Sequence, residues 1–193
     1  TIIFTCTHSA TTTQYTCGEL GTFDEDSAVK CPAGGDEKDT GVAPSGFFTP
    51  VDKRALQTAV DACIAEQSDG LCPKFAVTEW SSGLPYGSIG LWNISKVTSL
   101  ESLFEGKTEF NQDLSAWDVS KVTTLESTFY SAHVFNSNIS AWDVSKVTTL
   151  ESTFYNARVF NSDISAWNVS AVTTLYGTFW EASAFNSDIS AWD

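Results

Sequence analysis

The sequence predicts an α/β repeat solenoid, a right-handed coil of short parallel strands and short helices with a disulfide-stapled cap at its N-terminus. The second half of the chain repeats every 25 residues without insertion or deletion. A fixed period between about 20 and 50 residues is typical of stacked repeat arrays. All five cysteines precede the repeats, which places the predicted cap in the first part of the chain.

The repeat is carried by aromatic and aliphatic columns, in which one residue type returns at the same place in every unit. A unit such as 139–161 contributes Val147, Leu150, Phe154 and Phe160 to these columns. One coil cannot bury its apolar stripe alone, so stacking must bury it. The tryptophan column consists of Trp92, Trp117, Trp142, Trp167 and Trp192. We expect the Trp and Phe columns to dominate stability.

Spacing within a unit predicts its local structure. Ile139, Trp142 and Val144 are spaced i, i+3 and i+5, as in leucine-rich repeats, which predicts a short strand at 141–144. The i, i+3, i+7 spacing of the next apolar residues predicts a short helix or 3₁₀ turn at 147–155. An asparagine follows each second Phe. We interpret these asparagines as a structural ladder whose amides turn inward and bond backbone groups at the corners. They are Asn111, Asn136, Asn161 and Asn186.

Three regions follow from these patterns. Residues 1–48 form a Cys/Thr/Gly-rich segment with disulfides, opening on a short strand, I-I-F-T-C-T. Residues 49–91 contain a capping helix at 49–66 and a lead-in half-repeat, with Thr49 as N-cap and Pro50 at the first helical position. Residues 92–193 hold four 25-residue repeats and the start of a fifth. We expect the apolar helix face to cover the open end of the solenoid; it contains Leu56, Val60, Cys63 and Ile64.

The clustered cysteines indicate disulfides and an oxidising compartment. Cys63 and Cys72 flank a Gly-containing loop and are the best pair. Two of Cys6, Cys17 and Cys31 should also pair, leaving one cysteine for another partner. Zinc binding by these three with His8 is disfavoured, because the spacing fits no known ligand pattern. Three N-x-S sequons, at Asn93, Asn138 and Asn168, support N-glycosylation and an extracellular or cell-surface location.

The chain is strongly acidic, with 10 Lys and Arg against 24 Asp and Glu and a net charge of −14. This charge disfavours nucleic acid as a partner. No apolar run approaches the roughly 18 residues of a membrane helix, so we expect no membrane insertion. The favoured partners are protein or glycan ligands. The chain contains no Met, starts at Thr1 and stops just after a repeat restarts, which we interpret as a processed or partial chain.

Acidic columns are the strongest candidates for metal chemistry. One contains Asp113, Asp163 and Asp188, and another contains Glu101, Glu126 and Glu151. Carboxylates one coil apart would lie about 5 Å from each other. Their repulsion is relieved either by solvent and the column of Lys96, Lys121 and Lys146, or by calcium. We favour the solvated face, and therefore expect no metal and no cofactor.

No catalytic residue is predicted. His133 occurs once, without a partnering nucleophile pattern, and every coil bears the same acids, so a paired-acid glycosidase has no unique site. Ice binding by the threonine rows is also disfavoured, because the paired residues are adjacent and point in different directions. We therefore expect a protein that is not an enzyme.

The repeat W-D-V-S-K-V-T-T-L-E-S-T-F followed by F-N-S-D-I-S-A resembles the BspA-type leucine-rich-repeat surface proteins of bacteria and protists. With the preceding helix and Y-G-S-I-G-L-W-N-I-S, the resemblance covers roughly residues 50–193. It implies a secreted or surface-anchored interaction protein, often an adhesin, without catalytic residues. One departure is Leu at 125, 150 and 175, where family members often have Met.

Two functions fit this pattern. The first is an adhesive or scaffold interaction module, which would bind through the positions that vary most between coils. These are Tyr130, Ser131, His133, Tyr155, Asn156, Arg158, Trp180, Glu181 and Ser183. The second is a structural subunit of an extracellular filament that stacks head to tail on copies of itself, because the last coil has no evident cap.

Overall fold

The computed structural model describes residues 2–8, 11–17, 48–79 and 85–192. The chain divides into two units, Thr1–Ala43 and Pro44–Asp193. In the first, strands β1 (Ile2–His8) and β2 (Thr11–Cys17) form an antiparallel sheet with Cys6 opposite Thr13 and Ile2 opposite Cys17. The strand predicted at the start of the chain is therefore present. The disulfides predicted among Cys6, Cys17 and Cys31, and the alternative zinc site, fall on side chains outside the described part.

The second unit begins with helix α1 (Lys53–Glu66), followed by the short helix α2 (Pro73–Ala76) and the 3₁₀ turn η1 (Ile89–Leu91). Asp52, and not Thr49, is the N-cap of α1, so the predicted start was wrong. The backbone of Asp52 is extended, and its carboxylate accepts the N–H of Ala55 at 2.8 Å. A carboxylate both caps the free N–H groups and favours the positive end of the helix dipole. The helix therefore starts three residues after Pro50.

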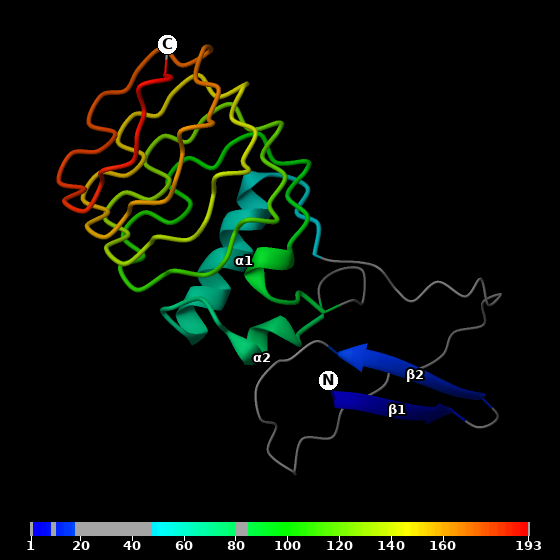
Figure 1. The fold of residues 1–193 in the computed structure, drawn as a ribbon. Helices are drawn as coiled ribbons and strands as arrows, with labels where there is room; N and C mark the ends of the chain where they lie inside the picture. The colour runs from blue at the N-terminus through cyan, green and yellow to red at the C-terminus, as the bar shows by residue number, and fades with distance from the viewer. Residues whose placement is uncertain (1, 9–10, 18–47, 80–84, 193) are drawn as a thin grey trace. The chain divides into compact units, whose positions relative to one another are not determined.

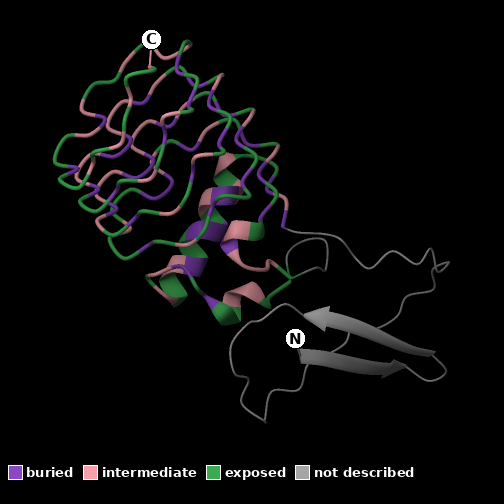
Figure 2. Cartoon of the chain, viewed as in Figure 1, coloured by how far each residue is buried: buried purple, intermediate pink, exposed green. Residues whose placement is uncertain are grey.

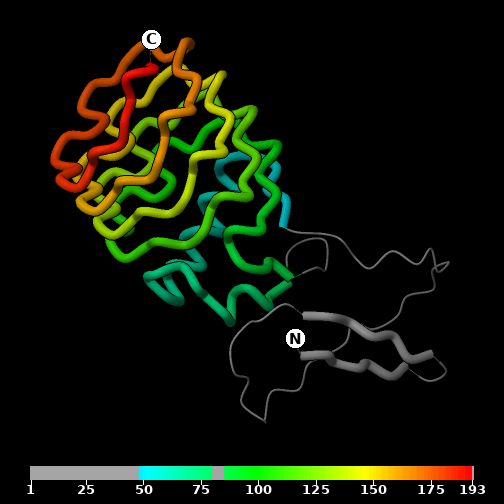
Figure 3. The backbone as a smooth tube through the Cα atoms, viewed as in Figure 1, coloured from blue at the N-terminus to red at the C-terminus, as the bar shows by residue number. Residues whose placement is uncertain are grey.

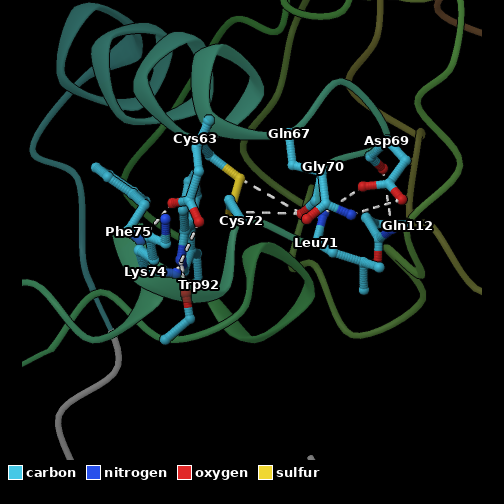
Figure 4. The surroundings of a disulfide bond; sticks show 12 residues. Cys63, Gln67, Asp69, Gly70, Leu71, Cys72, Lys74, Phe75, Trp92 and Gln112 are labelled. Carbon is cyan, nitrogen blue, oxygen red and sulfur yellow. Dashed lines mark hydrogen bonds between the residues drawn. A yellow bond between two sulfur atoms is a disulfide. The ribbon is translucent and has the colours of Figure 1, made fainter. Parts of the chain in front are cut away.

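The buried face of α1 contains Leu56, Ala59, Val60 and Cys63. Cys63 and Cys72 form a disulfide with their Cα atoms 5.1 Å apart, which is the pair favoured by the sequence (Figure 4). Both sulfur atoms lie within 3.5 Å of the Gly70 carbonyl oxygen. Since a disulfide carries no S–H, these are close contacts and not hydrogen bonds.

Helix α1 and its loop pack on the first repeating unit. Gly70 has a φ of +86°, and a Cβ there would lie 2.7 Å from the Phe110 ring, so only glycine fits. Gln112 Nε2 donates to the Asp69 carbonyl at 2.9 Å (Figure 4). Lys107 Nζ lies 2.7 Å from Asp61 Oδ1 on α1. Apolar burial and polar contacts together attach the helix to this unit.

Successive 25-residue segments from residue 89 onward lie beside one another (Figures 1 and 3). Parallel bridges join Ser99 to Thr124, Thr124 to Thr149, and Thr149 to Thr174. Beyond each bridge, alternate backbone N–H groups donate to the carbonyl 24 residues ahead, as Ser127 does to Glu151 at 2.9 Å. The intervening N–H groups donate three residues back, as Thr128 does to Leu125 at 3.0 Å. The backbone N–H groups of one unit thus bond alternately to their own turn and to the next segment.

This alternation differs from the predicted local structure. The parallel pairing lies at Thr149 and not at 141–144, and 151–156 is a run of turns, closer to the 3₁₀ alternative than to the short helix that the spacing also allowed. A helix cannot form because half of the N–H groups bond to the neighbouring segment and two residues per unit have left-handed φ. The left-handed positions form two columns: Ser102, Ser127, Ser152 and Gly177, and Gly106, Ser131, Asn156 and Glu181.

Buried residues recur along the successive segments (Figure 2), and the core that they form contains stacked aromatic rings. Phe104, Phe129 and Phe154 are fully buried, and consecutive rings are 5.5 and 5.6 Å apart with planes within 4°. Trp117, Trp142 and Trp167 are buried with their polar atoms satisfied, because each Nε1–H donates to the carbonyl 28 residues earlier. For Trp142 this acceptor is Leu114, at 3.1 Å. The columns predicted from the sequence are the ones that form the core.

Gly90 gives a direct test of how η1 packs on the first repeat. A Cβ at this position would lie 2.1 Å from the Asp113 carbonyl oxygen, so Gly90→Ala must displace backbone. We expect it to lower the free energy of unfolding by about 1–3 kcal/mol, measured by urea unfolding followed by Trp fluorescence. The comparison variant is Gly106→Ser, for which nothing lies within 4 Å of the Cβ position and Ser131 occupies the same column. Its left-handed φ of +67° costs a side chain about 1 kcal/mol, so we expect Gly90→Ala to lose more stability than this variant. Equal stability of the two variants would contradict this packing.

Candidate functional site

In a repeating chain, residues that recur in every unit have a structural explanation first. The asparagine ladder is one example: Asn136 N–H donates to Asn111 Oδ1 at 2.8 Å, and Asn161 and Asn186 continue the row at 2.7 Å. These side chains are exposed and not turned inward as expected. They join the corners of successive units from outside, since each amide oxygen accepts the backbone N–H of the next asparagine.

The Asp and Asn residues two positions before Ser form a second structural set. In each, the side-chain Oδ1 accepts the backbone N–H of the Ser, as Asp118 does from Ser120 at 3.0 Å. This is an Asx-turn, which Asp and Asn form equally well. Two columns are built this way, Asp113, Asn138, Asp163 and Asp188, and Asn93, Asp118, Asp143 and Asn168.

The Asx-turns give the three sequons a structural origin. Wherever such a turn uses Asn in place of Asp, an N-x-S sequence results. Asn93, Asn138 and Asn168 are all exposed, and each Oδ1 is already bonded within its turn. The geometry thus accounts for the motif without glycosylation, and it leaves the side chains accessible from solvent.

The same turns lower the pKa of the aspartate carboxyl groups. Hydrogen bonds from Ser120 and Ser145 hold the pKa of Asp118 and Asp143 below its ordinary value, because they stabilise the carboxylate. Asp113, Asp163 and Asp188 have a lowered pKa for the same reason, from Ser115, Ser165 and Ser190. Within the described ranges, no three His, Cys, Asp or Glu side chains gather as a metal site would require.

One corner of the repeat departs from this regularity. We call residues 130–134, 155–159 and 180–184 the non-repeating corner; its counterpart in the first unit is 105–109. The backbone there is the same in each unit: Gly106, Ser131 and Asn156 each donate to the next segment at 2.6–2.8 Å. The side chains differ, since Glu105 is followed in its column by Tyr130, Tyr155 and Trp180. The fold therefore does not dictate these side chains.

The aromatic side chains of the corner form a row. Tyr130 and Tyr155 stack with centroids 4.6 Å apart and planes within 8°, and Trp180 lies 6.5 Å beyond Tyr155 at 4°. Tyr155 is half-buried with a ring on each face, so the part that reaches solvent is its edge. Burial, and then the Glu181 carboxylate, raise the pKa of the Tyr155 hydroxyl. The row thus exposes ring edges and neutral hydroxyl donors.

A polar network runs beside this row. Asn156 Nδ2 lies 3.2 Å from both Ser131 Oγ and His133 Nε2 in the preceding unit. Arg158 Nε donates to Asn156 Oδ1 at 3.0 Å. The structure therefore brings together Tyr130, His133, Tyr155, Arg158 and Trp180, and it places Glu181 at a left-handed φ of 58°. The sequence singled out these positions by their variation but gave no sign that Asn156 connects them.

The non-repeating corner has the groups from which a binding surface is built, because it presents an exposed guanidinium, ring edges and hydroxyl groups at one place. Val134 and Val159 add exposed apolar surface, at 41% and 43% of their area. Among the helices that the structure describes, none is long and apolar enough to cross a membrane.

The Asx-turns predict how stability depends on pH. A carboxyl whose pKa is lower in the folded than in the unfolded state stabilises the fold above the unfolded pKa of about 3.9, and this stabilisation is lost as pH falls through the folded pKa. We therefore expect the thermal midpoint to fall below about pH 4. Asp118→Asn with Asp143→Asn should keep stability at pH 7, because Asn93 and Asn168 make the same turn, and should reduce the fall in acid.

The control for this experiment is Asp118→Ala with Asp143→Ala, which removes the acceptors and should lower the midpoint at both pH values. Protein made in bacteria avoids glycosylation of the new N-x-S sequences. An unchanged acid dependence in the Asn variant would show that these turns do not carry it.

The repeating segments coincide with a known family. A family model described as Mycoplasma protein of unknown function, DUF285, matches residues 77–192, which is more than half of the chain. No curated protein matches the chain, and no solved structure does. The chain therefore belongs to the DUF285 family.

Proposed function

We propose that this chain is a non-enzymatic interaction module of the cell surface or extracellular space, which holds a protein or glycan ligand at the non-repeating corner. In this proposal residues 85–192 are a solenoid of the leucine-rich-repeat-like class. The observation that supports it most is the contrast within one corner. The backbone hydrogen bonds of Gly106, Ser131 and Asn156 are alike, whereas the side chains around them change from unit to unit.

The composition of the corner supports a binding role. Tyr, Trp and Arg are enriched in the central residues of protein interfaces. Here they occur together with exposed valines on a backbone held by hydrogen bonds to both neighbouring segments. Such a surface loses little conformational entropy when it binds, because its backbone is already ordered.

The location rests on two further observations. The Cys63–Cys72 disulfide is typical of proteins exposed to an oxidising compartment. The resemblance of the repeats to BspA-type surface proteins points the same way, and it is a finer assignment than the match to the DUF285 family. Adhesion or scaffolding is the activity that this resemblance implies.

Replacing the corner with residues that this chain itself uses elsewhere tests the proposal. The variant carries His133→Thr and Arg158→Ser, which introduce the residue types that Thr108 and Ser183 provide in the same column. It also carries Tyr130→Ser and Tyr155→Ser. Binding of the whole chain to arrays of glycans and extracellular proteins is measured for both forms. We expect the variant to remain folded by circular dichroism and to lose at least about tenfold in affinity for the ligand that the native chain selects.

The control is Lys96→Ala with Lys121→Ala, which alters an exposed repeating column and should leave binding within about twofold. If the control variant loses binding and the corner variant keeps it, the ligand site lies on the repeating face and the proposal is wrong.

A further inference from the structure

We propose that Arg158 is the anchor of the non-repeating corner and binds a carboxylate in an acidic segment of a partner protein. This inference rests on the proposed function, because it names the chemistry that the same surface would recognise. Three features of the structure carry it: the guanidinium is positioned, it has no ion-pair partner among the described residues, and the surface beside it contains exposed apolar side chains.

The guanidinium is positioned at Nε, and the backbone that carries it is held separately. Arg158 Nε donates to Asn156 Oδ1 at 3.0 Å, and Asn156 is itself held by Ser131 and His133. The carbonyl of Arg158 accepts from Ala184 N–H and Ser183 Oγ, both at 3.1 Å. With Nε occupied, the two Nη groups remain as a planar pair of donors, which matches the two oxygens of a carboxylate.

Among residues 48–79 and 85–192 the Arg158 guanidinium has no ion-pair partner, because the one ion pair there joins Lys107 to Asp61. Most Lys and Arg side chains of these residues are likewise without an ion pair, so what sets Arg158 apart is the hydrogen bond that orients it. An exposed and oriented guanidinium suits a carboxylate supplied from outside.

The surroundings favour a peptide as the source of that carboxylate. Tyr130 and Trp180 cover both faces of Tyr155, so this ring offers its edge, which carries partial positive charge. Val159, the neighbour of Arg158 in the chain, and Val134 add apolar surface, with 43% and 41% of their area exposed. Trp180 at the end of the row is 62% exposed, and a glycan stacked on it is the outcome that contradicts this inference. An acidic side chain flanked by apolar residues complements both parts of this surface.

The test is selection from a display library of random 12-residue peptides on the intact chain, followed by affinity measurement with the selected peptides made synthetically. We expect peptides with Asp or Glu at one constant position beside apolar residues. Arg158→Ala should weaken them at least about tenfold, and Arg158→Lys should also weaken them, because lysine keeps the charge but not the planar pair of donors.

Two variants separate positioning from charge. Asn156→Gly removes the side chain that holds Arg158 while preserving the left-handed backbone, as Gly106 does in the same column, and it should weaken binding several-fold. Lys146→Ala removes one exposed positive charge in a repeating column outside the non-repeating corner and should change affinity less than about twofold. Thermal melts confirm that each variant is folded.

The outcomes distinguish this inference from the proposed function. Selected peptides that bind Arg158→Ala as well as the native chain, or that share no acidic position, overturn the inference but leave an interaction module. Arg158-dependent binding of a sialylated oligosaccharide without any peptide also overturns it, because the partner is then a glycan. Failure to bind any peptide, glycan or arrayed extracellular protein overturns both proposals.

Discussion

The backbone hydrogen bonds between segments are the constraint on which the rest of this structure depends. Each unit donates alternate N–H groups to carbonyls 24 residues ahead, so an insertion of a single residue would shift every later group out of line. This explains why the 25-residue period has no interruption. It also explains the ring columns, because a constant register places each Phe and Trp directly against its counterpart, with planes within a few degrees.

The same register explains why polar side chains are needed at the corners of each unit. A segment that bonds half of its N–H groups to a neighbour leaves corners whose backbone needs other partners. Asparagine, Asp and Thr supply them: Thr153 Oγ1 is buried and donates to the Leu125 carbonyl at 2.9 Å. The Asp columns and the sequons thus arise from structural need before any ligand is considered. The sequence showed these columns clearly, but their chemistry is that of turns.

A feature of this structure could be predicted from the sequence where residue spacing determines it, and could not where hydrogen bonds between units determine it. The period, the buried columns and the Cys63–Cys72 pair follow from the sequence, because each is a matter of spacing. The local conformation at 147–155 does not, because the i, i+3, i+7 spacing fits both a helix and turns whose N–H groups bond to the next segment. One signal was available. Gly106 and Gly177 interrupt columns of Ser and Asn, and such an exchange indicates left-handed backbone.

The non-repeating corner was visible as variation, but its organisation was not, because the Ser131–His133–Asn156–Arg158 network spans two units and depends on side-chain direction. A stack of nearly identical units offers the same surface many times, and repetition alone cannot make one site unlike the others. Specificity has to come from columns whose side chains are not determined by the hydrogen bonds between units. At Arg158 the backbone carbonyl serves the stack, while the guanidinium serves no contact that the other units share. Uniform backbone and individual side chains are therefore compatible at this corner, and a single site can form there without disturbing the core.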